Sequence, residues 1–268
     1  MWKSSALSVS LLSVGLLALA SECASALEVK NARPSYGPLG ATRPDSKFLP
    51  GDVLFIHYDI EGLTPHAKTG KVGYYSELEF LDSKGKTISS KKSDTQSLLP
   101  DLGPKSVAGV MNAVMGEDQK PGKYTVKLKV TDVNSKKTTE FSYPFELLPK
   151  GFGAIRVLSP AFGVPGGEGM VQFVLIELPL DKKGNPNIDI TMTITEDGSK
   201  TALSKKVISF PKELPDDVNL QKQNFVPVVI PISNLNRSGR FMINVDMEEK
   251  NQKRNLKLQF PLTVLDLK

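Results

Sequence analysis

The sequence contains very little cysteine, tryptophan or histidine. Its 268 residues include one Cys, one Trp and two His. Cys23 and Trp2 both lie in an N-terminal stretch that has the layout of a removable export signal. A mature chain without cysteine excludes disulfides, thiol catalysis and cysteine-bound metals. Two histidines also leave few ligands for a metal centre and few bases for a serine-type triad.

Residues 1–26 are typical of a secretory signal. Lys3 supplies the positive start, a short apolar run follows, and Ala24-Ser25-Ala26 is a small-x-small cleavage site. The run is shorter than the ~20 residues that span a bilayer, which disfavours a retained anchor. A lipid-modified Cys23 is disfavoured because Glu22, rather than a small residue, precedes it. We expect a secreted or periplasmic protein, cleaved after Ala26, with no transmembrane segment in the mature chain.

The charge pattern excludes one class of partner. The formal net charge is +5 and the pI is about 9.1, but the basic residues are spread over both halves of the chain. Neither half has the basic tail or patch that is typical of nucleic-acid binding, and we therefore predict no nucleic-acid partner.

Two stretches of the chain repeat one pattern. Tyr143-Pro144-Phe145 corresponds to Phe260-Pro261-Leu262, which lies 117 residues later, and at the same offset Gly122-Lys123-Tyr124 corresponds to Gly239-Arg240-Phe241. A fixed offset over this length indicates a tandem duplication. Pro144 and Pro261 cannot donate to a β-ladder, so their strands should lie at an edge or carry a bulge.

Alternation of apolar and polar residues predicts short strands throughout both copies. The expected strands lie at 51–61, 72–81, 106–115, 124–130, 138–148, 169–179, 187–196, 226–232, 241–247 and 255–265. Residues 106–115 also fit a short helix, and the repeat favours a strand. The run 51–61 has apolar residues in both parities, which fits a bulge or a strand that is buried on both faces.

These elements predict an all-β fold of two tandem immunoglobulin-like antiparallel β-sandwiches. We expect the signal peptide at 1–26, the first sandwich at 27–148, a linker at 149–151 and the second sandwich at 152–268. Because the linker is short and contains Pro149, we expect the sandwiches to lie end to end with little hinge freedom.

Residues 117–132 (EDQKPGKYTVKLKVTD) resemble the sixth strand of bacterial immunoglobulin-like domains, including the PKD and macroglobulin-like sandwiches. The resemblance implies a sandwich with a role in binding or spacing at the cell surface. It also implies that the Tyr124 hydroxyl closes a corner by bonding upstream backbone. Phe241, at the same place in the second copy, has no hydroxyl for such a bond.

Few residues offer chemistry. His57 and His66 have no metal-ligand spacing, although His57 can pair with Asp59 on the same strand. Glu77 and Glu79 share one strand face, and we expect them to lie opposite Lys127 and Lys129. We therefore predict no catalytic site, metal or cofactor; a hydrolase would need a pocket around one of the two histidines.

Two surface features are candidates for binding. Lys136-Lys137 and Lys253-Arg254 occupy the same predicted hairpin tip in both copies, where they can contact an anionic partner or simply keep the tip soluble. Tyr75 is the candidate for stacking against a sugar. The sequence thus predicts an exported, non-enzymatic binding or structural module, which acts through loops and strand edges on a protein or cell-envelope polymer. The alternative is a carbohydrate-binding protein centred on Tyr75.

Overall fold

The computed structural model describes residues 26–99, 106–212, 214, 220–232 and 235–266. The predicted signal, with Cys23, lies outside the described residues except for Ala26. Within the described residues the chain forms seventeen strands and one four-residue helix, α1 (Leu220–Gln223). This composition confirms the predicted all-β class. None of the helical structure described is long and apolar enough to cross a bilayer.

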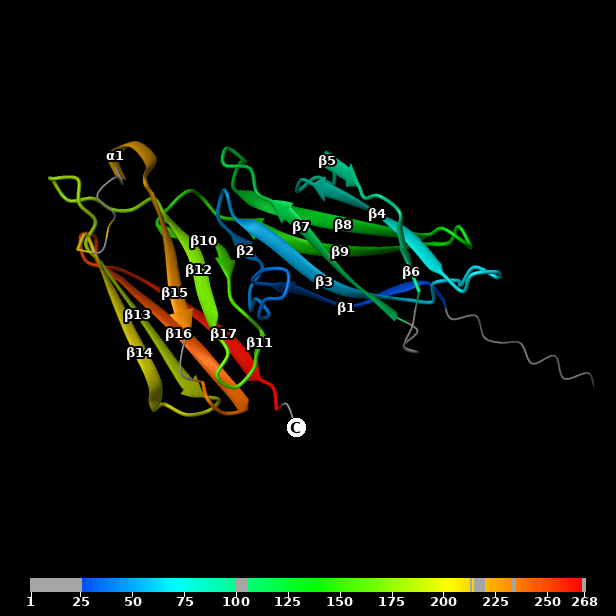
Figure 1. Cartoon of the computed structure of the whole chain (residues 1–268). Helices are drawn as coiled ribbons and strands as arrows, with labels where there is room; N and C mark the ends of the chain where they lie inside the picture. The colour runs from blue at the N-terminus through cyan, green and yellow to red at the C-terminus, as the bar shows by residue number, and fades with distance from the viewer. Residues whose placement is uncertain (1–25, 100–105, 213, 215–219, 233–234, 267–268) are drawn as a thin grey trace, which may run out of the picture.

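The first half of the chain forms two sheets (Figure 1). The smaller has the order β1-β3-β7, with β1 at Glu28–Ser35, β3 at Val53–Glu61 and β7 at Ser106–Val114. The larger has the order β2-β9-β8-β4-β5, and β6 also pairs with β4. Its strands are β2 (Lys47–Phe48), β4 (Val72–Leu81), β5 (Thr87–Lys92), β6 (Gln96–Leu98), β8 (Gly122–Asp132) and β9 (Thr138–Leu147).

The second half repeats this plan. Its smaller sheet has the order β10-β12-β15, with β10 at Gly153–Leu158, β12 at Gly169–Ile176 and β15 at Phe225–Ile232. Its larger sheet has the order β11-β17-β16-β13-β14. These strands are β11 (Phe162–Gly163), β13 (Ile188–Glu196), β14 (Ala202–Phe210), β16 (Gly239–Glu249) and β17 (Arg254–Val264). The corresponding strands follow the same order in both halves, as a duplication requires.

The expected antiparallel pairing holds for the long strands, but two short pairs are parallel. β2 runs parallel to β9 at Glu146–Leu147, and β11 runs parallel to β17 at Thr263–Val264. In each half the chain crosses from the smaller sheet to the larger one before forming this two-residue strand. It therefore arrives alongside the last strand of the half in the same direction.

Several local predictions are decided by the strand environment. β3 lies between β1 and β7, and its even-numbered residues from Leu54 to Ile60 are buried while the alternate residues are half-buried. The bulge lies in β1, between Lys30 and Arg33, and not in β3. Residues 106–114 form a strand rather than a helix.

The two repeated prolines mark strand edges. Pro144 and Pro261 are exposed on β9 and β17, and each faces its neighbouring strand without a register shift. The opposite side of each strand is covered only by a two-residue partner further along. The edge position is therefore confirmed, and no bulge is needed to accommodate the missing N–H.

The corner that the resemblance implies at Tyr124 is present. Its hydroxyl donates a 2.6 Å hydrogen bond to the carbonyl of Lys120, whereas Phe241 in the second half is simply buried. We expect Tyr124→Phe to lower the free energy of unfolding by about 1 kcal/mol, the net value of one such bond. Tyr75→Phe is the matched control in urea unfolding, because the Tyr75 hydroxyl bonds none of the described residues. An equal effect of both changes would contradict the corner.

The two halves meet at a buried junction. Tyr36 and Ala41, from the loop between β1 and β2, belong to the hydrophobic core of the second half's sheets. The Tyr36 ring stands edge-on to Phe260 at 5.0 Å between centroids. The backbone N–H of Arg156 donates a 2.8 Å hydrogen bond to the carboxylate of Asp52. The division of the chain into two domains at 149–151 stays a prediction. If the halves are separate domains, these contacts form the interface between them.

Candidate functional site

The two predicted hairpin tips exist, but they do not form one site. Lys136 and Lys253 lie in equivalent turns and both adopt a left-handed backbone, with φ of 63° and 58°. All four tip cations, including Lys137 and Arg254, are exposed, and no carboxylate of the described residues lies within 4.0 Å of them. The β8–β9 turn and the β16–β17 turn stand at opposite ends of the molecule (Figure 1). A single compact ligand therefore contacts only one tip.

A buried carboxylate holds the first tip in place. Asp132 accepts hydrogen bonds from the N–H of Thr64 at 2.9 Å, the N–H of Asn134 at 2.9 Å and the hydroxyl of Ser135 at 2.6 Å. The Asn134 amide then donates to the carbonyls of Thr64 and Lys71 in the neighbouring loop. The carboxylate and the amide together clamp the hairpin to the loop between β3 and β4.

The second tip has the same clamp, which the sequence analysis missed. The fully buried Glu249 accepts the N–H groups of Asn251 at 2.6 Å and Gln252 at 2.9 Å. The Asn251 amide donates to the carbonyls of Pro179 at 2.9 Å and Asn185 at 3.3 Å. Both the acidic residue and the asparagine stand 117 positions after their counterparts, so the repeat offset was the signal that could have found them.

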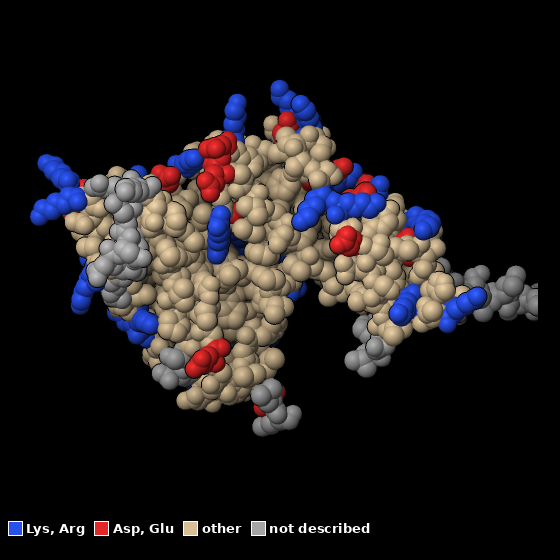
Figure 2. All heavy atoms as spheres, turned by 45° about the horizontal axis from the view of Figure 1, so that its top comes forward, with Lys and Arg blue, Asp and Glu red and all other residues tan. Residues whose placement is uncertain are grey.

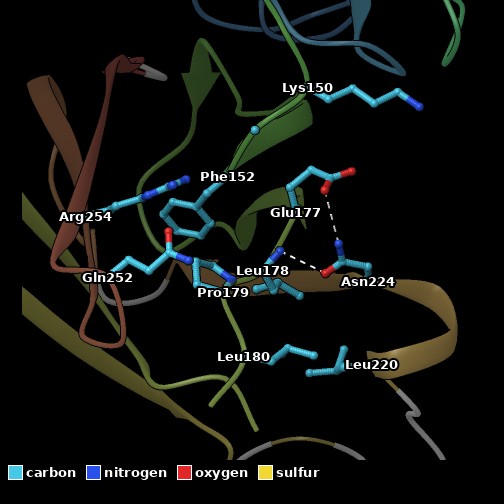
Figure 3. Close-up of a pocket in the computed structure, with 11 residues that line it drawn as sticks. Lys150, Phe152, Glu177, Leu178, Pro179, Leu180, Leu220, Asn224, Gln252 and Arg254 are labelled. Carbon is cyan, nitrogen blue, oxygen red and sulfur yellow. Dashed lines mark hydrogen bonds between the residues drawn. The ribbon is translucent and has the colours of Figure 1, made fainter. Parts of the chain in front are cut away.

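Beside the second tip the surface is hollowed into a cavity of about 580 Å³, which we call the tip pocket (Figure 3). Its walls come from the segment after β9, the end of β12, helix α1 and the start of β17. The lining residues are 150–152, 177–180, Leu220, Asn224, Gln252 and Arg254. Of the predicted site residues, only Arg254 lines this pocket.

The tip pocket is built around two residues with a left-handed backbone. Glu177 has φ 50° and Asn224 has φ 47°, a conformation that is uncommon outside glycine and frequent at functional sites. The Asn224 side chain accepts the N–H of Leu178 at 3.0 Å and donates to the Glu177 carboxylate at 3.3 Å (Figure 3). Asn224 also ends α1, since its N–H bonds the carbonyl of Leu220. Nothing in the local sequence pattern marks Glu177.

Tyr75 is a half-buried residue on β4 rather than an open stacking platform. The ammonium group of Lys92 lies 4.0 Å from the centroid of its ring, so a cation already covers one face. Stacking of a sugar on Tyr75 stays a prediction.

The expected carboxylate–lysine pairing on the larger first sheet is confirmed. Glu77 lies directly opposite Lys129, and Glu79 directly opposite Lys127. The Glu77–Lys129 ion pair spans 3.9 Å, whereas Lys127 pairs with Glu140 at 2.8 Å instead of with Glu79. Glu77, Lys127 and Lys129 each have an oppositely charged partner within 4.0 Å, and Glu79 faces Lys127 across the strand pair.

The histidines do not form a catalytic arrangement. The His57 ring nitrogen Nε2 lies 3.3 Å from the carbonyl of Gly37, and Asp59 accepts a hydrogen bond from Asn31, so both residues have partners other than the His57–Asp59 pair that the sequence allowed. His57 and Asp59 lie on the same face of β3, but each hydrogen-bonds a residue outside the strand instead of the other. His66 contacts only Thr69 within its turn. No cluster of three metal-ligating side chains occurs among the described residues.

The outer face of the β10-β12-β15 sheet is apolar and exposed along β12 and β15, while β10 carries the exposed Arg156 within its irregular segment. Neither β12 nor β15 contains a charged residue. Val229, Met170 and Phe225 are 54%, 46% and 43% exposed, and their register places them on one face. This face, here called the apolar sheet face, comprises Leu158, Met170, Gln172, Val174, Ile176, Phe225, Pro227, Val229 and Pro231. Figure 2 shows a broad surface without charged side chains on this half of the molecule.

The first half of the chain already covers one border of this face. Ile155 on β10 is paired with Val174, yet it is only 6% exposed. A Cβ built on Gly51 would lie 3.2 Å from the Ile155 side chain, and one built on Gly153 would overlap Leu49. The apolar sheet face therefore continues from the junction between the halves out to the free edge at β15.

No family model matches this sequence, and no curated protein does either. Among solved structures, the chain is similar over part of its length to a family 123 glycoside hydrolase from Clostridium perfringens, described for glycolipid glycan hydrolysis. The identity is 16% and the TM-score is 0.29, and the alignment covers 39% of this chain and 23% of that chain. A likeness of this size carries no information about activity.

Proposed function

We propose that this chain is an exported, non-enzymatic binding module of two tandem immunoglobulin-like sandwiches, which holds a protein partner on the apolar sheet face. The observation that supports the proposal is the exposure of Met170, Phe225 and Val229 on two neighbouring strands without charge. The largest contiguous apolar patch of a monomeric protein, typically about 300–600 Å² in area, is often a binding surface.

The size of the face favours a segment of another protein over a second copy of this chain. Eight paired positions at ~3.3 Å spacing and three strands at ~4.8 Å spacing give a flat area of roughly 380 Å². A stable interface needs about 800 Å² from each partner, so two such faces pressed together fall short. An amphipathic helix, which is ~10 Å wide and carries an apolar stripe, fits the area and the absence of charge.

The free edge of β15 is not the binding element. Among the described strands β15 pairs only with β12, and Pro227 and Pro231 remove two of the N–H groups that an added strand would need. A partner therefore gains more from covering the face than from extending the sheet. This refines the prediction that the protein binds through its strand edges.

Val229→Lys should weaken binding, because the added ammonium group would have to be desolvated beneath an apolar partner. Val207→Lys on β14 is the matched control, since Val207 is 48% exposed on the other sheet of the same half. We expect the Val229 variant to elute earlier than wild type from a phenyl matrix, and the control to change less.

The decisive measurement compares the three proteins as baits in an envelope extract from the source organism. The proposal expects at least one protein that wild type and Val207→Lys capture equally and that Val229→Lys loses by tenfold or more. Circular dichroism and urea unfolding of all three baits exclude loss of fold. If no captured protein depends on Val229, the proposal is wrong.

A further inference from the structure

The tip pocket has the properties of a small-ligand site that is separate from the apolar sheet face. Its volume of about 580 Å³ lies within the ~300–1,000 Å³ of small-molecule sites, which combine apolar walls with a few convergent polar groups. We propose that it binds a molecule in which an apolar body carries a carboxylate group.

The floor of the pocket supplies the apolar contact. Leu178 and Leu220 are 4% and 5% exposed. Phe152 and Leu180 line the same pocket and are half-buried. Leu180 and Leu220 face each other across the floor, and Phe152 stands on the side of Arg254 (Figure 3). A ligand with an aliphatic or aromatic body would remove the exposed parts of Phe152 and Leu180 from water.

The rim supplies the positive charge. Lys150 and Arg254 both line the pocket. Lys150 lies 3.4 Å from Asp118, an ion pair open to solvent, whereas Arg254 has no acidic partner within 4.0 Å among the described residues. A guanidinium group has the planar fork that matches a carboxylate. Glu177 opposes an anion, but its carboxylate accepts a hydrogen bond from Asn224 and does not reach across the pocket (Figure 3).

The pocket is also held in shape before a ligand arrives. The side chain of Asn224 bonds both the Leu178 N–H and Glu177, and the second clamp ties Asn251 to the carbonyl of Pro179 in the same lining segment, 177–180. A wall fixed by these bonds loses little conformational freedom on binding, which favours affinity for a small ligand. The left-handed backbone conformations of Glu177 and Asn224 are energetically unfavourable, and such conformations are frequent where a protein holds a ligand.

The test is a titration of the mature protein followed by amide NMR shifts. Decanoate is the probe, and decanol and decyltrimethylammonium are matched probes that lack the negative charge. Decanoate should shift the Gly151 and Leu178 amides, and the other two probes should bind about two- to fivefold more weakly, which is the range for one exposed ion pair. Equal binding of decanol and decanoate would overturn the proposal, and so would the absence of any shift with decanoate and with the peptide described next.

A peptide arm separates the two sources of such a carboxylate. A short peptide ending in leucine with a free carboxylate is compared with its amidated form, and both are compared with decanoate. Saturation by the free-acid peptide alone assigns the site to protein C-termini, and saturation by decanoate alone assigns it to fatty acids. Either result supports the shared chemistry, whereas equal binding of the amidated peptide contradicts it.

Two neighbouring variants give the control within the chain. Arg254→Gln should raise the apparent Kd for decanoate about fivefold, while Lys253→Gln removes an equal charge one residue away from the lining and should leave it unchanged. Equal effects of the two would mean that only the general charge of the tip attracts the probe, and the pocket would be rejected. Retention of Val229-dependent capture by Arg254→Gln keeps this test independent of the proposed function.

Discussion

Asp52→Ala is expected to lower the free energy of unfolding by about 3–5 kcal/mol, the range for removing one partner of a buried ion pair. Asp52 is 1% exposed, and its carboxylate lies 2.9 Å from the Arg43 guanidinium. The same carboxylate accepts the backbone N–H groups of Val53 and Arg156, each at 2.8 Å. Truncation would take the buried carboxylate away from the Arg43 guanidinium and leave the backbone N–H groups of Val53 and Arg156 without this acceptor.

The surroundings of Arg43 explain why loss of the Asp52 carboxylate should be strongly destabilising. Only 11% of the Arg43 side chain is exposed, and its guanidinium carbon lies 4.0 Å from the centroid of the Phe48 ring. Arg43 also donates to the carbonyl of Lys47. Because these contacts hold Arg43 in place, it cannot turn to solvent when Asp52 is removed.

A neighbouring residue provides the control. Asp45 also contacts Arg43, at 3.4 Å, but 52% of its side chain is exposed. Asp45→Ala should therefore lower the free energy of unfolding by about 1 kcal/mol or less. The double variant Arg43→Met/Asp52→Ala should recover part of the loss, because it removes the stranded charge. Urea unfolding measures all of them; similar values for the Asp52 and Asp45 variants would contradict the role of burial.

The strands of this fold could be predicted because period-two alternation is a local property. The duplication added long-range information: the 117-residue offset located the equivalent hairpins and favoured a strand at 106–115 over a helix. The hydrogen bond of the Tyr124 hydroxyl was predicted from the resemblance of one strand to immunoglobulin-like domains. In each case the signal lay within a few tens of residues, or was repeated at a constant distance.

The junction and the binding surfaces could not be predicted in this way. Asp52 and Arg156 are 104 residues apart, and no local pattern connects them. The run 226–232 (VPVVIPI) is apolar in both parities, so alternation could not tell which side would be exposed. The tip pocket depends on the meeting of Lys150, Glu177 and Arg254 from three separate segments, which only the tertiary fold brings together.

Asp132→Ala is the second change with a large expected effect. Its fully buried carboxylate binds three donors, from Thr64, Asn134 and Ser135, and a buried donor left unsatisfied costs about 1–3 kcal/mol. We expect a loss of about 3 kcal/mol in urea unfolding, since part of the turn can relax into water. Asp82→Ala, in the exposed β4–β5 turn, removes a similar local cap and should cost about 1 kcal/mol. Equal losses would contradict a clamp between two loops.

The pH dependence tests the charge of the clamp separately from its shape. Burial by itself raises the pKa of the Asp132 carboxyl, but the hydrogen bonds from Ser135 and Thr64 outweigh it and hold the pKa below the ordinary 3.8. A lowered pKa in the folded state means that the stabilisation is complete above pH 3.8 and is lost as the pH falls through the lower folded value. The difference in unfolding free energy between wild type and Asp132→Asn should therefore be constant from pH 7 to pH 5 and shrink between pH 4 and pH 2. Asp118→Asn, at a fully exposed carboxylate, should show no such change. A difference that persists unaltered at pH 2 would mean that the shape of the side chain, and not its ionisation, holds the hairpin.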